Sequence, residues 1–470
     1  MNSVNAAPAP RPRDTSSRRP WALVVVGVCV VVATATLAIP AAVTYDAWAW
    51  LTWGREITRG ALDTSVGPSW KPLPVMVTVL LPVTGGAAPV IWLVLTRVAS
   101  LLVLVFAYRL AARFAGVAAG AVAVVLVLVT PDLDPRYLRL LLEGHSATVT
   151  ALLMLAAIDF HLGRRRAVAF LMVLALALDR PEAWPFLLLY GAWLFRYEPR
   201  LRWLITVGTA LVPALWFGVD WWGSGSPLHG ADAAQVSATD DGRIGTAFMR
   251  VGQAVPEPAF LLSAVALVFA HRRRVRSLDA IAAITLAWFV LVVGMTALFG
   301  YAALSRFLLP AAVLVCVLAG IGTVWAWQAM ATRVPAVLAA VALVLVFAPF
   351  VAVRAGGVPE LLREAEHRQR LMDGLDTAIE AAGGRDAVVR CGRVAIDDRG
   401  SAAVALAYKL DLPMREIRPA VDGVPGVTFV TADSERYAYV TGKPAVSITG
   451  TTVAETPVWN VVESRCGRRG

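Results

Sequence analysis

Long apolar runs with almost no charge constrain the fold of this chain more than any other feature. Four of them are residues 22–39, 117–129, 204–219 and 334–353. A helix needs roughly 20 apolar residues to cross a bilayer, and the alternating strands of a membrane barrel would not give uninterrupted runs. Charged residues make up only 16% of the chain, whereas about 25% is usual in a soluble domain. The sequence therefore predicts an integral membrane protein built from helices.

Arginine positions predict how the helices cross the membrane. The net charge is +10, and basic residues concentrate in cytoplasmic loops. The groups that we place in the cytoplasm are Arg11 to Arg19; Arg109 and Arg113; Arg164, Arg165 and Arg166; Arg196, Arg200 and Arg202; Arg272, Arg273, Arg274 and Arg276; and Arg333. Crossing and returning between them gives about eleven spans, near 21–43, 88–110, 114–130, 145–162, 166–179, 184–196, 203–220, 257–271, 278–299, 306–328 and 334–353. An odd number puts the N-terminus in the cytoplasm and the C-terminus outside.

The predicted spans divide the chain into three parts. Residues 1–20 form a cytoplasmic tail, residues 21–354 the transmembrane domain, and residues 355–470 an extracytoplasmic domain. The first apolar stretch could instead be a cleaved signal peptide, because basic residues precede it and Pro40-Ala41-Ala42 follows it. The stretch is long for that role, and more spans follow, so we favour an uncleaved span.

The C-terminal part has ordinary polarity and is predicted to be a small α/β domain. Residues 360–382 have the pattern of a helix, and 387–391, 427–431, 437–440 and 458–462 have that of short strands. Cys391 and Cys466 both lie in this part, which suggests one disulfide if the domain faces an oxidising compartment. Cys29 and Cys316 lie in apolar runs and are predicted to be packing residues.

The predicted outer loops are 44–87, 131–144, 179–183, 221–256 and 300–305, and ionisable residues gather in them. Asp46 directly follows the first span, Glu143 and His145 end the second loop, and Arg180 and Glu182 lie in the third. Arg306 opens a later span. Wet loops are often polar without further meaning, but ionisable residues at a membrane boundary also mark functional sites. The first loop contains Trp48, Trp50, Trp53 and Trp70, residues suited to a membrane interface, and a short apolar segment at 73–83 that we predict to be an interfacial or re-entrant helix.

Several strings in these loops resemble the GT-C superfamily of glycosyltransferases that use polyprenyl-phosphate-linked sugars. The order of first span, acidic residue and Trp/Pro-rich outer loop is similar to that family. Trp70-Lys71-Pro72-Leu73-Pro74 looks like its first-loop proline segment, and Arg180-Pro181-Glu182 like its "RPE" string. The segments 221–228 and Ser305–Pro310 look like the "YYG…PLP" and "RYLLP" strings of the arabinofuranosyl- and mannosyltransferase branch. The resemblance covers roughly residues 20–330.

The resemblance implies an all-α, polytopic membrane enzyme with a GT-C-like fold, a first outer loop at 44–87 and a small C-terminal α/β domain. Such an enzyme takes a sugar from a polyprenyl-phosphate donor in the membrane and passes it to an envelope glycan, lipid or protein on the outer face. Asp46 corresponds to the general base. Lys71, Arg180 and Arg306 are the candidate cations for the phosphate, with Glu182 beside them. Glu143 and His145 could bind sugar or acceptor hydroxyls.

Several features keep other interpretations open. Many relatives have two adjacent acids in the first loop, whereas Tyr45 and Ala47 flank Asp46, so a divalent metal is possible but not indicated and no other cofactor is predicted. Lys71 could be an interfacial lysine, and Trp221 and Trp222 could be interface anchors.

A transporter or flippase of an envelope precursor is the main alternative to a glycosyltransferase, although we find no internal repeat of the kind common in that class. A membrane scaffold without catalytic activity is the other. Nucleic acid is not an expected partner, since the positive-inside rule explains the basic charge.

The composition adds one association about the donor. Lysine occurs only at 71, 409 and 443, so nearly all basic residues are arginine. Together with abundant Ala and Val, this suggests a GC-rich, actinobacterial-type genome. Arabinofuranose and mannose are then both plausible donor sugars.

Overall fold

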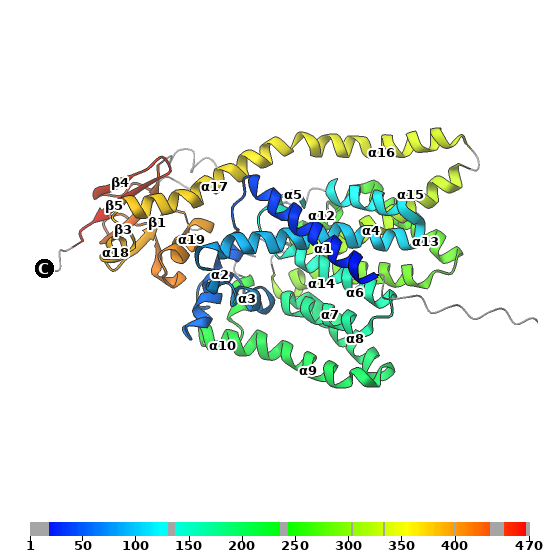
Figure 1. Ribbon diagram of the computed structural model, residues 1–470, viewed down its shortest axis with the longest axis horizontal. Coiled ribbons are helices and arrows are strands. Elements are labelled where there is room, and N and C mark those ends of the chain that lie inside the picture. The colour runs from blue at the N-terminus through cyan, green and yellow to red at the C-terminus, as the bar shows by residue number, and fades with distance from the viewer. Residues whose placement is uncertain are drawn as a thin grey trace, which may run out of the picture.

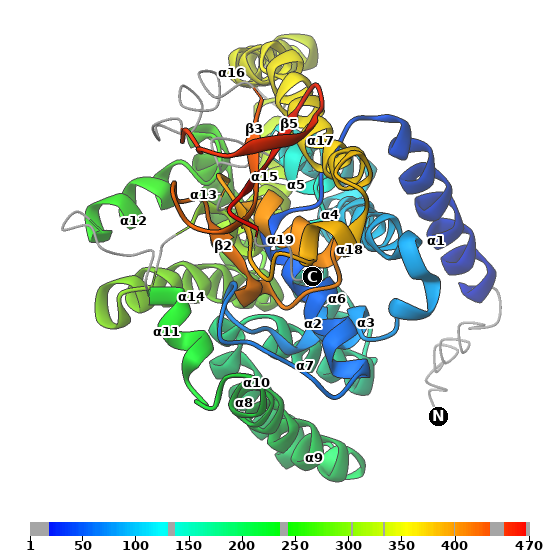
Figure 2. The same cartoon turned by 90° about the vertical axis from the view of Figure 1, so that its left-hand side faces the viewer.

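Long helices that share one general direction make up most of the structure (Figure 1). The computed structural model describes residues 18–129, 137–235, 243–301, 304–331, 334–398, 400–432 and 446–466. The predicted strand at 437–440, Arg333 and the loop residues 131–136 lie outside the described residues. A small sheet-containing domain sits at one end of the helical bundle, and Figure 2 looks onto that end.

The helices and strands have the following bounds. The α-helices are α1 Arg18–Ala35, α2 Tyr45–Thr58, α3 Pro72–Thr78, α4 Ala88–Val129, α5 Tyr137–Leu142, α6 Ala147–Leu162, α7 Arg166–Asp179, α8 Trp184–Tyr197, α9 Arg202–Pro213, α10 Val219–Ser224, α11 His229–Gln235, α12 Arg243–Gly252, α13 Glu257–Arg272, α14 Arg276–Phe299, α15 Leu309–Met330, α16 Ala336–Gly356, α17 Val358–Ala381, α18 Arg385–Val389 and α19 Ser401–Lys409. Short 3₁₀ turns are η1 Thr36–Ala38, η2 Pro82–Ala87, η3 Pro181–Ala183, η4 Pro199–Leu201, η6 Ser305–Leu308 and η7 Met414–Glu416, and η5 Ala214–Gly218 is a π-helical turn. The strands are β1 Val394–Ile396, β2 Ile417–Pro419, β3 Gly426–Thr431, β4 Thr451–Glu455 and β5 Trp459–Ser464.

Helix α15 is the centre of the bundle. Every residue from Leu309 to Trp325 is buried, which is the arrangement expected of a helix that is apolar on all sides. Glycines let its neighbours approach closely: a Cβ on Gly322 would lie 1.8 Å from the Leu262 carbonyl oxygen in α13, and one on Gly320 would lie 2.6 Å from the Ala119 carbonyl oxygen in α4. Small residues at such positions are typical of helices packed within a membrane.

Helix α4 is a hairpin rather than one straight rod. Ala115 and Gly116 leave the helical conformation, and Gly116 has φ +82°. A Cβ on Gly120 would lie 2.6 Å from the Tyr108 ring, although twelve residues of straight helix would separate the two by about 18 Å. The chain therefore folds back at Gly116, a conformation that glycine adopts without steric cost.

The helical membrane architecture is confirmed, but the count of eleven spans is not. Among the described residues, six helices are long and apolar enough to cross a membrane, or seven if the pair 244–252 and 257–272, bent by 73°, counts as one span. The predicted spans at 145–162, 166–179 and 184–196 correspond to α6, α7 and α8, which have 16, 14 and 14 residues. These helices are shorter than the roughly 20 residues of a full crossing, so their status as spans stays a prediction.

The C-terminal part contains a five-stranded sheet in the order β2-β1-β3-β5-β4. Strands β2, β1 and β3 are parallel, and β5 pairs antiparallel with both β3 and β4. The predictions of a helix at 360–382 and of strands at 427–431 and 458–462 are confirmed by α17, β3 and β5. The strand predicted at 387–391 is wrong: Gly383 and Gly384 turn the chain with positive φ and α18 follows, because a short apolar run suits a helix as well as a strand.

The tryptophans of the first loop do not lie at a membrane interface as predicted. Trp48, Trp50, Trp53 and Trp70 are at most 5% exposed. They belong to one hydrophobic core with residues of α17, α19 and the sheet, including Trp459. The interface prediction fails because the C-terminal domain covers this loop, a long-range contact that amphipathic residue type alone does not reveal. The first loop and the C-terminal domain thus pack as one unit at the end of the bundle.

Candidate active site

Asp46 lies in the first turn of α2, where the chain leaves the first predicted span. The backbone is extended at Thr44 and becomes helical at Tyr45. A carboxylate is favourable at this position because the first N–H groups of a helix have no partner within the helix. The side chain of Asp46 is 16% exposed, so it is largely shielded from water without being sealed off.

Two cations approach the same carboxylate oxygen of Asp46. Arg306 Nη2 lies 3.2 Å and Lys71 Nζ 4.0 Å from Asp46 Oδ2. Arg306 comes from the turn η6 just before α15, and Lys71 comes from the residue before α3, where Pro72 starts the helix. The ammonium group of Lys71 also lies 5.2 Å from the centre of the Trp50 ring, a cation–π contact that holds it beside the carboxylate.

Arg180 supplies a third cation near this pair. It is only 3% exposed, and its guanidinium lies 4.5 Å from the centre of the Phe307 ring, next to Arg306. Its Nε lies 3.9 Å from Asp179 Oδ2 and donates a 3.4 Å hydrogen bond to Thr150 Oγ1. Three sequence-distant segments thus bring Lys71, Arg180 and Arg306 together around Asp46, and we call these four residues the Asp46 cluster.

Glu143 and His145 lie beside the cluster and connect it to the C-terminal domain. His145 Nε2 is 3.6 Å from Glu143 Oε2. Arg139 Nε is 3.1 Å from Glu143 Oε1, and Arg368 of α17 forms an ion pair with the same oxygen. The carboxylate of Glu143 therefore joins the bundle to α17.

Burial and neighbouring charges shift the pKa values of Asp46, Glu143 and Lys71 away from their ordinary values. Burial raises the pKa of Asp46, but Arg306 and then Lys71 outweigh burial and hold that pKa below the ordinary value. Burial lowers the pKa of Lys71 to about 8, with Arg180 adding to the effect. Burial also lowers the pKa of His145, and the contacts of Glu143 with His145, Arg368 and Arg139 lower its own pKa despite burial. At neutral pH the site holds ionised carboxylates, a neutral imidazole and a lysine that titrates unusually early.

A cavity of about 360 Å³ adjoins the cluster. Thr44, Glu143, His145 and Arg306 line it from the bundle, and Arg368 and Ser401 line it from the C-terminal domain. Its volume falls within the range of small-molecule sites. Arg306 Nε is buried and has no hydrogen-bond partner among the described residues. The site thus has space for a ligand beside an arginine whose hydrogen-bonding capacity is not fully used within the described part of the chain.

The remaining predicted site residues lie elsewhere. Glu182 is 6% exposed, and its carboxylate raises the pKa of Tyr301, on which burial has the larger effect. No contact in the described part of the chain joins it to Asp46. Cys391 and Cys466 are joined by a disulfide, with Cα atoms 5.4 Å apart. With Glu463 they form the only three-residue set with metal-ligand spacing among the described residues, but cysteines in a disulfide offer no thiolate to an ion.

Sequence reasoning gave no site role to Arg368 or to Asp179. Arg368 lies on a helix with several other arginines, so no local signal separates it from its exposed neighbours. Asp179 is fully buried and accepts a 2.5 Å hydrogen bond from Thr150 Oγ1. Its position at the end of an apolar helix, directly before Arg180, was the available signal.

Comparisons with known proteins support the fold. Neither a family model nor a curated protein sequence matches the chain. Among solved structures, ArnT from Cupriavidus metallidurans in the apo state has 17% sequence identity and a TM-score of 0.54, with 95% of this chain and 98% of that chain covered. The same protein bound to undecaprenyl phosphate gives a TM-score of 0.52 at 17% identity, with 94% and 98% covered.

An archaeal protein is also similar. The oligosaccharyltransferase AglB from Archaeoglobus fulgidus, in complex with an inhibitory peptide and a dolichol-phosphate, has 10% identity and a TM-score of 0.52, with 90% of this chain and 70% of that chain covered. The similarity extends over nearly the whole chain, including the C-terminal domain, and shows that this chain has the same overall fold as ArnT and AglB.

Proposed function

We propose that this protein transfers a sugar from a polyprenyl-phosphate-linked donor to an envelope acceptor on the outer face of the plasma membrane. One observation carries the proposal: a largely shielded carboxylate, Asp46, lies among three buried or half-buried cations beside a cavity at one end of the bundle. Transfer from a phosphate leaving group needs these two elements, a base for the incoming hydroxyl and positive charge for the outgoing phosphate.

The chemistry is a single displacement at the anomeric carbon. The acceptor oxygen forms a bond to that carbon, and the bond to the phosphate oxygen breaks with its electron pair. The hydroxyl proton passes to Asp46, and the polyprenyl phosphate leaves as an anion. Attack opposite the leaving group inverts the anomeric configuration.

The cations have two successive partners in this proposal. Without donor, Arg306 and Lys71 neutralise Asp46. A bound phosphate competes for the same cations, with Arg180 as the third, and arginine's planar fork suits phosphate oxygens. As the cations turn to the phosphate, burial acts on Asp46 with less opposition and its pKa rises, which makes it a stronger base when the substrate is present.

Other residues have supporting roles. Glu143 and His145 would bind hydroxyls of the sugar or the acceptor, and Arg368 would fix Glu143 from the C-terminal domain. Glu182 would act on the donor side, next to Arg180. Arabinofuranose and mannose are the candidate sugars, and the acceptor would be a glycan, lipid or protein. The ArnT structure with undecaprenyl phosphate and the AglB structure with a dolichol-phosphate support a polyprenyl-phosphate carrier.

The proposed orientation follows from the arginine distribution. The N-terminal tail would lie in the cytoplasm, and the domain from residue 355 would lie outside, where an oxidising compartment would keep the Cys391–Cys466 disulfide intact. If the α4 hairpin crosses twice, on either side of Gly116, the seven candidate spans become eight, and the shorter helices α6, α7 and α8 would complete eleven crossings.

Transfer of radiolabelled sugar by membranes that contain this protein tests the proposal. Membranes would be supplied with polyprenyl-phosphate arabinofuranose or mannose, with wild-type, Asp46→Ala and Asp373→Asn proteins at equal abundance. Asp373 is an exposed aspartate of α17, so its substitution controls for loss of a carboxylate. We expect transfer by the wild type and the control and none by Asp46→Ala.

Three results would contradict the proposal in whole or in part. Full transfer by Asp46→Ala would remove Asp46 as the base. Movement of a lipid-linked precursor across vesicles, without glycosylated product from any donor, would favour the transporter; neither activity in a well-folded protein would favour the scaffold.

A further inference from the structure

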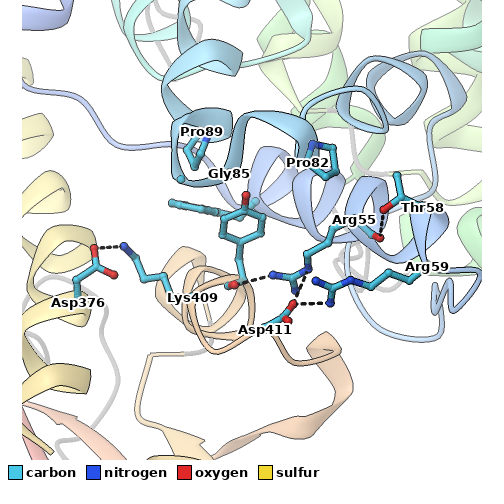
Figure 3. Close-up of a pocket in the computed structure, with 12 residues that line it drawn as sticks. Arg55, Thr58, Arg59, Pro82, Gly85, Pro89, Asp376, Lys409 and Asp411 are labelled. Carbon is cyan, nitrogen blue, oxygen red and sulfur yellow. Dashed lines mark hydrogen bonds and ion pairs between the residues drawn. The ribbon is translucent and has the colours of Figure 1, made fainter. Parts of the chain in front are cut away.

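A second cavity, of about 480 Å³, lies between the first loop and the C-terminal domain. Figure 3 shows its charged side chains in two ion-pair groups on opposite sides, with Gly85 and Pro89 above them. In one group, Lys409 Nζ is 2.5 Å from Asp376 Oδ2. In the other, Arg55 Nε and Arg59 Nη1 are 3.0 and 2.7 Å from Asp411 Oδ1. We call this cavity the loop–domain cleft.

Helix α2 separates the cleft from the Asp46 cluster. Successive residues of a helix are rotated by about 100°, which places Asp46, Trp50 and Trp53 on one face. Trp48, Arg55 and Arg59 share the opposite face and line the cleft. The two faces of α2 therefore serve two different sites, and the cleft is no extension of the cavity beside Asp46 through the helix.

The two cavities nevertheless follow each other along the surface between the bundle and the C-terminal domain. On α17, Arg368 lines the first cavity and Asp376 the cleft; eight residues of helix are about 12 Å. On α19, Ser401 lines the first and Tyr408 the cleft; seven residues are about 10 Å. The named residues that line the two cavities are thus about 10–12 Å apart along both helices.

The lining favours a neutral, hydroxyl-rich ligand. Three cations face two carboxylates, and each cation already has an anionic partner, so an incoming anion would compete with Asp376 and Asp411. Hydroxyl groups can instead accept from the ammonium and guanidinium groups and donate to the carboxylates without separating the pairs. Trp48 and Tyr408, with ring centres 5.3 Å apart, add aromatic surface. Trp48 Nε1 is buried without a hydrogen-bond partner among the described residues.

We propose that the loop–domain cleft is a carbohydrate-binding subsite that holds a unit of an oligosaccharide acceptor about 10–12 Å from the unit in the first cavity. The acceptor class is then a glycan of several sugars rather than a single sugar or a small lipid headgroup. This inference rests on the proposed function for the identity of the ligand as acceptor, but binding to the cleft is independent of transfer.

The glycine turn η2 offers a way to fill the cleft without removing a contact. Gly86 has no positive φ, and a Cβ there would meet no atom within 4 Å. Gly86→Trp would therefore occupy the cleft. The double variant Asp376→Asn with Lys409→Gln would remove one ion pair. Glu366→Gln is the matched control, because Glu366 forms an exposed pair with Arg370 on the same helix α17 but lines neither cavity.

Isothermal titration of the purified full-length protein, without donor, measures binding directly. The probes are the methyl glycosides of a tetramannoside and a tetra-arabinofuranoside. We expect one of them to bind the wild type and Glu366→Gln equally and to bind Gly86→Trp and the double variant at least tenfold more weakly. A matching rise in KM for that tetrasaccharide, with a monosaccharide acceptor unaffected, is expected in transfer assays.

The outcomes separate this inference from the proposed function. Tetrasaccharide binding that is lost in both variants, without transfer from any donor, leaves the subsite standing and removes the enzyme. Transfer by a protein that binds neither tetrasaccharide, or whose binding survives both variants, overturns the subsite alone. The protein could instead bind phosphatidylglycerol vesicles and not the glycans, with this binding lost in both variants. That result also overturns the subsite, and it assigns the cleft to a lipid headgroup.

Discussion

Asp159 in the helical bundle and Asp46 at the end of the bundle are both shielded carboxylates, but they have different surroundings. Asp159, about 18 Å along α6 from its first residue, is 2% exposed, and each of its oxygens has its own arginine: Arg109 at 2.7 Å and Arg113 at 2.8 Å. Asp46 receives Arg306 at 3.2 Å and Lys71 at 4.0 Å on one oxygen, Oδ2. Within the described part of the chain, no hydrogen bond reaches its Oδ1.

The difference is the one expected between a structural ion pair and the general base that we propose. Asp159 is saturated, and its arginines extend toward solvent with 53% and 37% of their side chains exposed. Asp46 has looser contacts, an excess of nearby positive charge and a cavity beside it. A saturated carboxylate cannot accept a proton without breaking a strong pair, whereas Asp46 keeps one oxygen available. Burial is common to both aspartates, so it does not distinguish the proposed base from a structural acid. The oxygen of Asp46 that accepts no hydrogen bond within the described part of the chain does distinguish the two.

The largest difference in transfer activity should be seen between the variants that replace Asp46 and Asp159. Asp46→Asn keeps the shape of the side chain but removes the base, so we expect transfer to fall by about 10²–10⁴-fold, the usual contribution of general acid–base catalysis. Asp159→Asn should change transfer by less than about twofold, since a surface-linked ion pair contributes little beyond stability. Initial rates in membranes with equal protein content measure both. Equal losses in the two variants would show that Asp46 is structural too.

The sequence could predict the helical membrane architecture and the four residues of the Asp46 cluster, for identifiable reasons. Apolar runs specify helices, and the loop strings around Asp46, Lys71, Arg180 and Arg306 are local. The sequence could not determine the number of membrane crossings, because α6, α7 and α8 are shorter than a full span. The burial of the first-loop tryptophans and the contact of Arg368 with Glu143 depend on how the C-terminal domain docks, and no local pattern specifies that docking.

Replacing an arginine beside each aspartate should give a second difference in transfer activity, in the same direction but smaller. Arg306→Gln removes a charged hydrogen-bond donor from the proposed phosphate, a loss of about 1.5–3 kcal/mol, and kcat/KM should fall by roughly 10- to 100-fold. Arg306→Lys should recover part of this activity, because it restores the charge but not the planar fork. Arg109→Gln, which leaves Asp159 paired with Arg113, should be nearly neutral. Steady-state kinetics with varied donor concentration would test this, and a large loss in Arg109→Gln would contradict the assignment.

The pH dependence of transfer should report Lys71. Burial lowers the pKa of this lysine to about 8, so the ammonium form is lost as pH rises through 8, and an enzyme that needs the cation loses activity in that direction. Above pH 8, kcat/KM should fall by up to about tenfold per pH unit if only this group titrates. Lys71→Arg, which stays charged throughout, should remove the decline. A decline that persists unchanged in Lys71→Arg would mean that another group titrates there.

The smallest effect that we expect is the change in protein stability when Asp159 is replaced. Asp159→Asn leaves Arg109 and Arg113 without their anion, but both are half-exposed and can be solvated, so the loss should be about 1–2 kcal/mol rather than the larger cost of a fully buried unpaired charge. We expect the Tm in detergent to fall by about 2–4 °C, with Asp373→Asn unchanged. Asp46→Asn should leave the Tm unchanged or raise it, because its carboxylate is buried and only loosely paired. A lower Tm for Asp46→Asn than for Asp159→Asn would reverse the comparison, since it would make Asp46 the carboxylate on which the bundle depends.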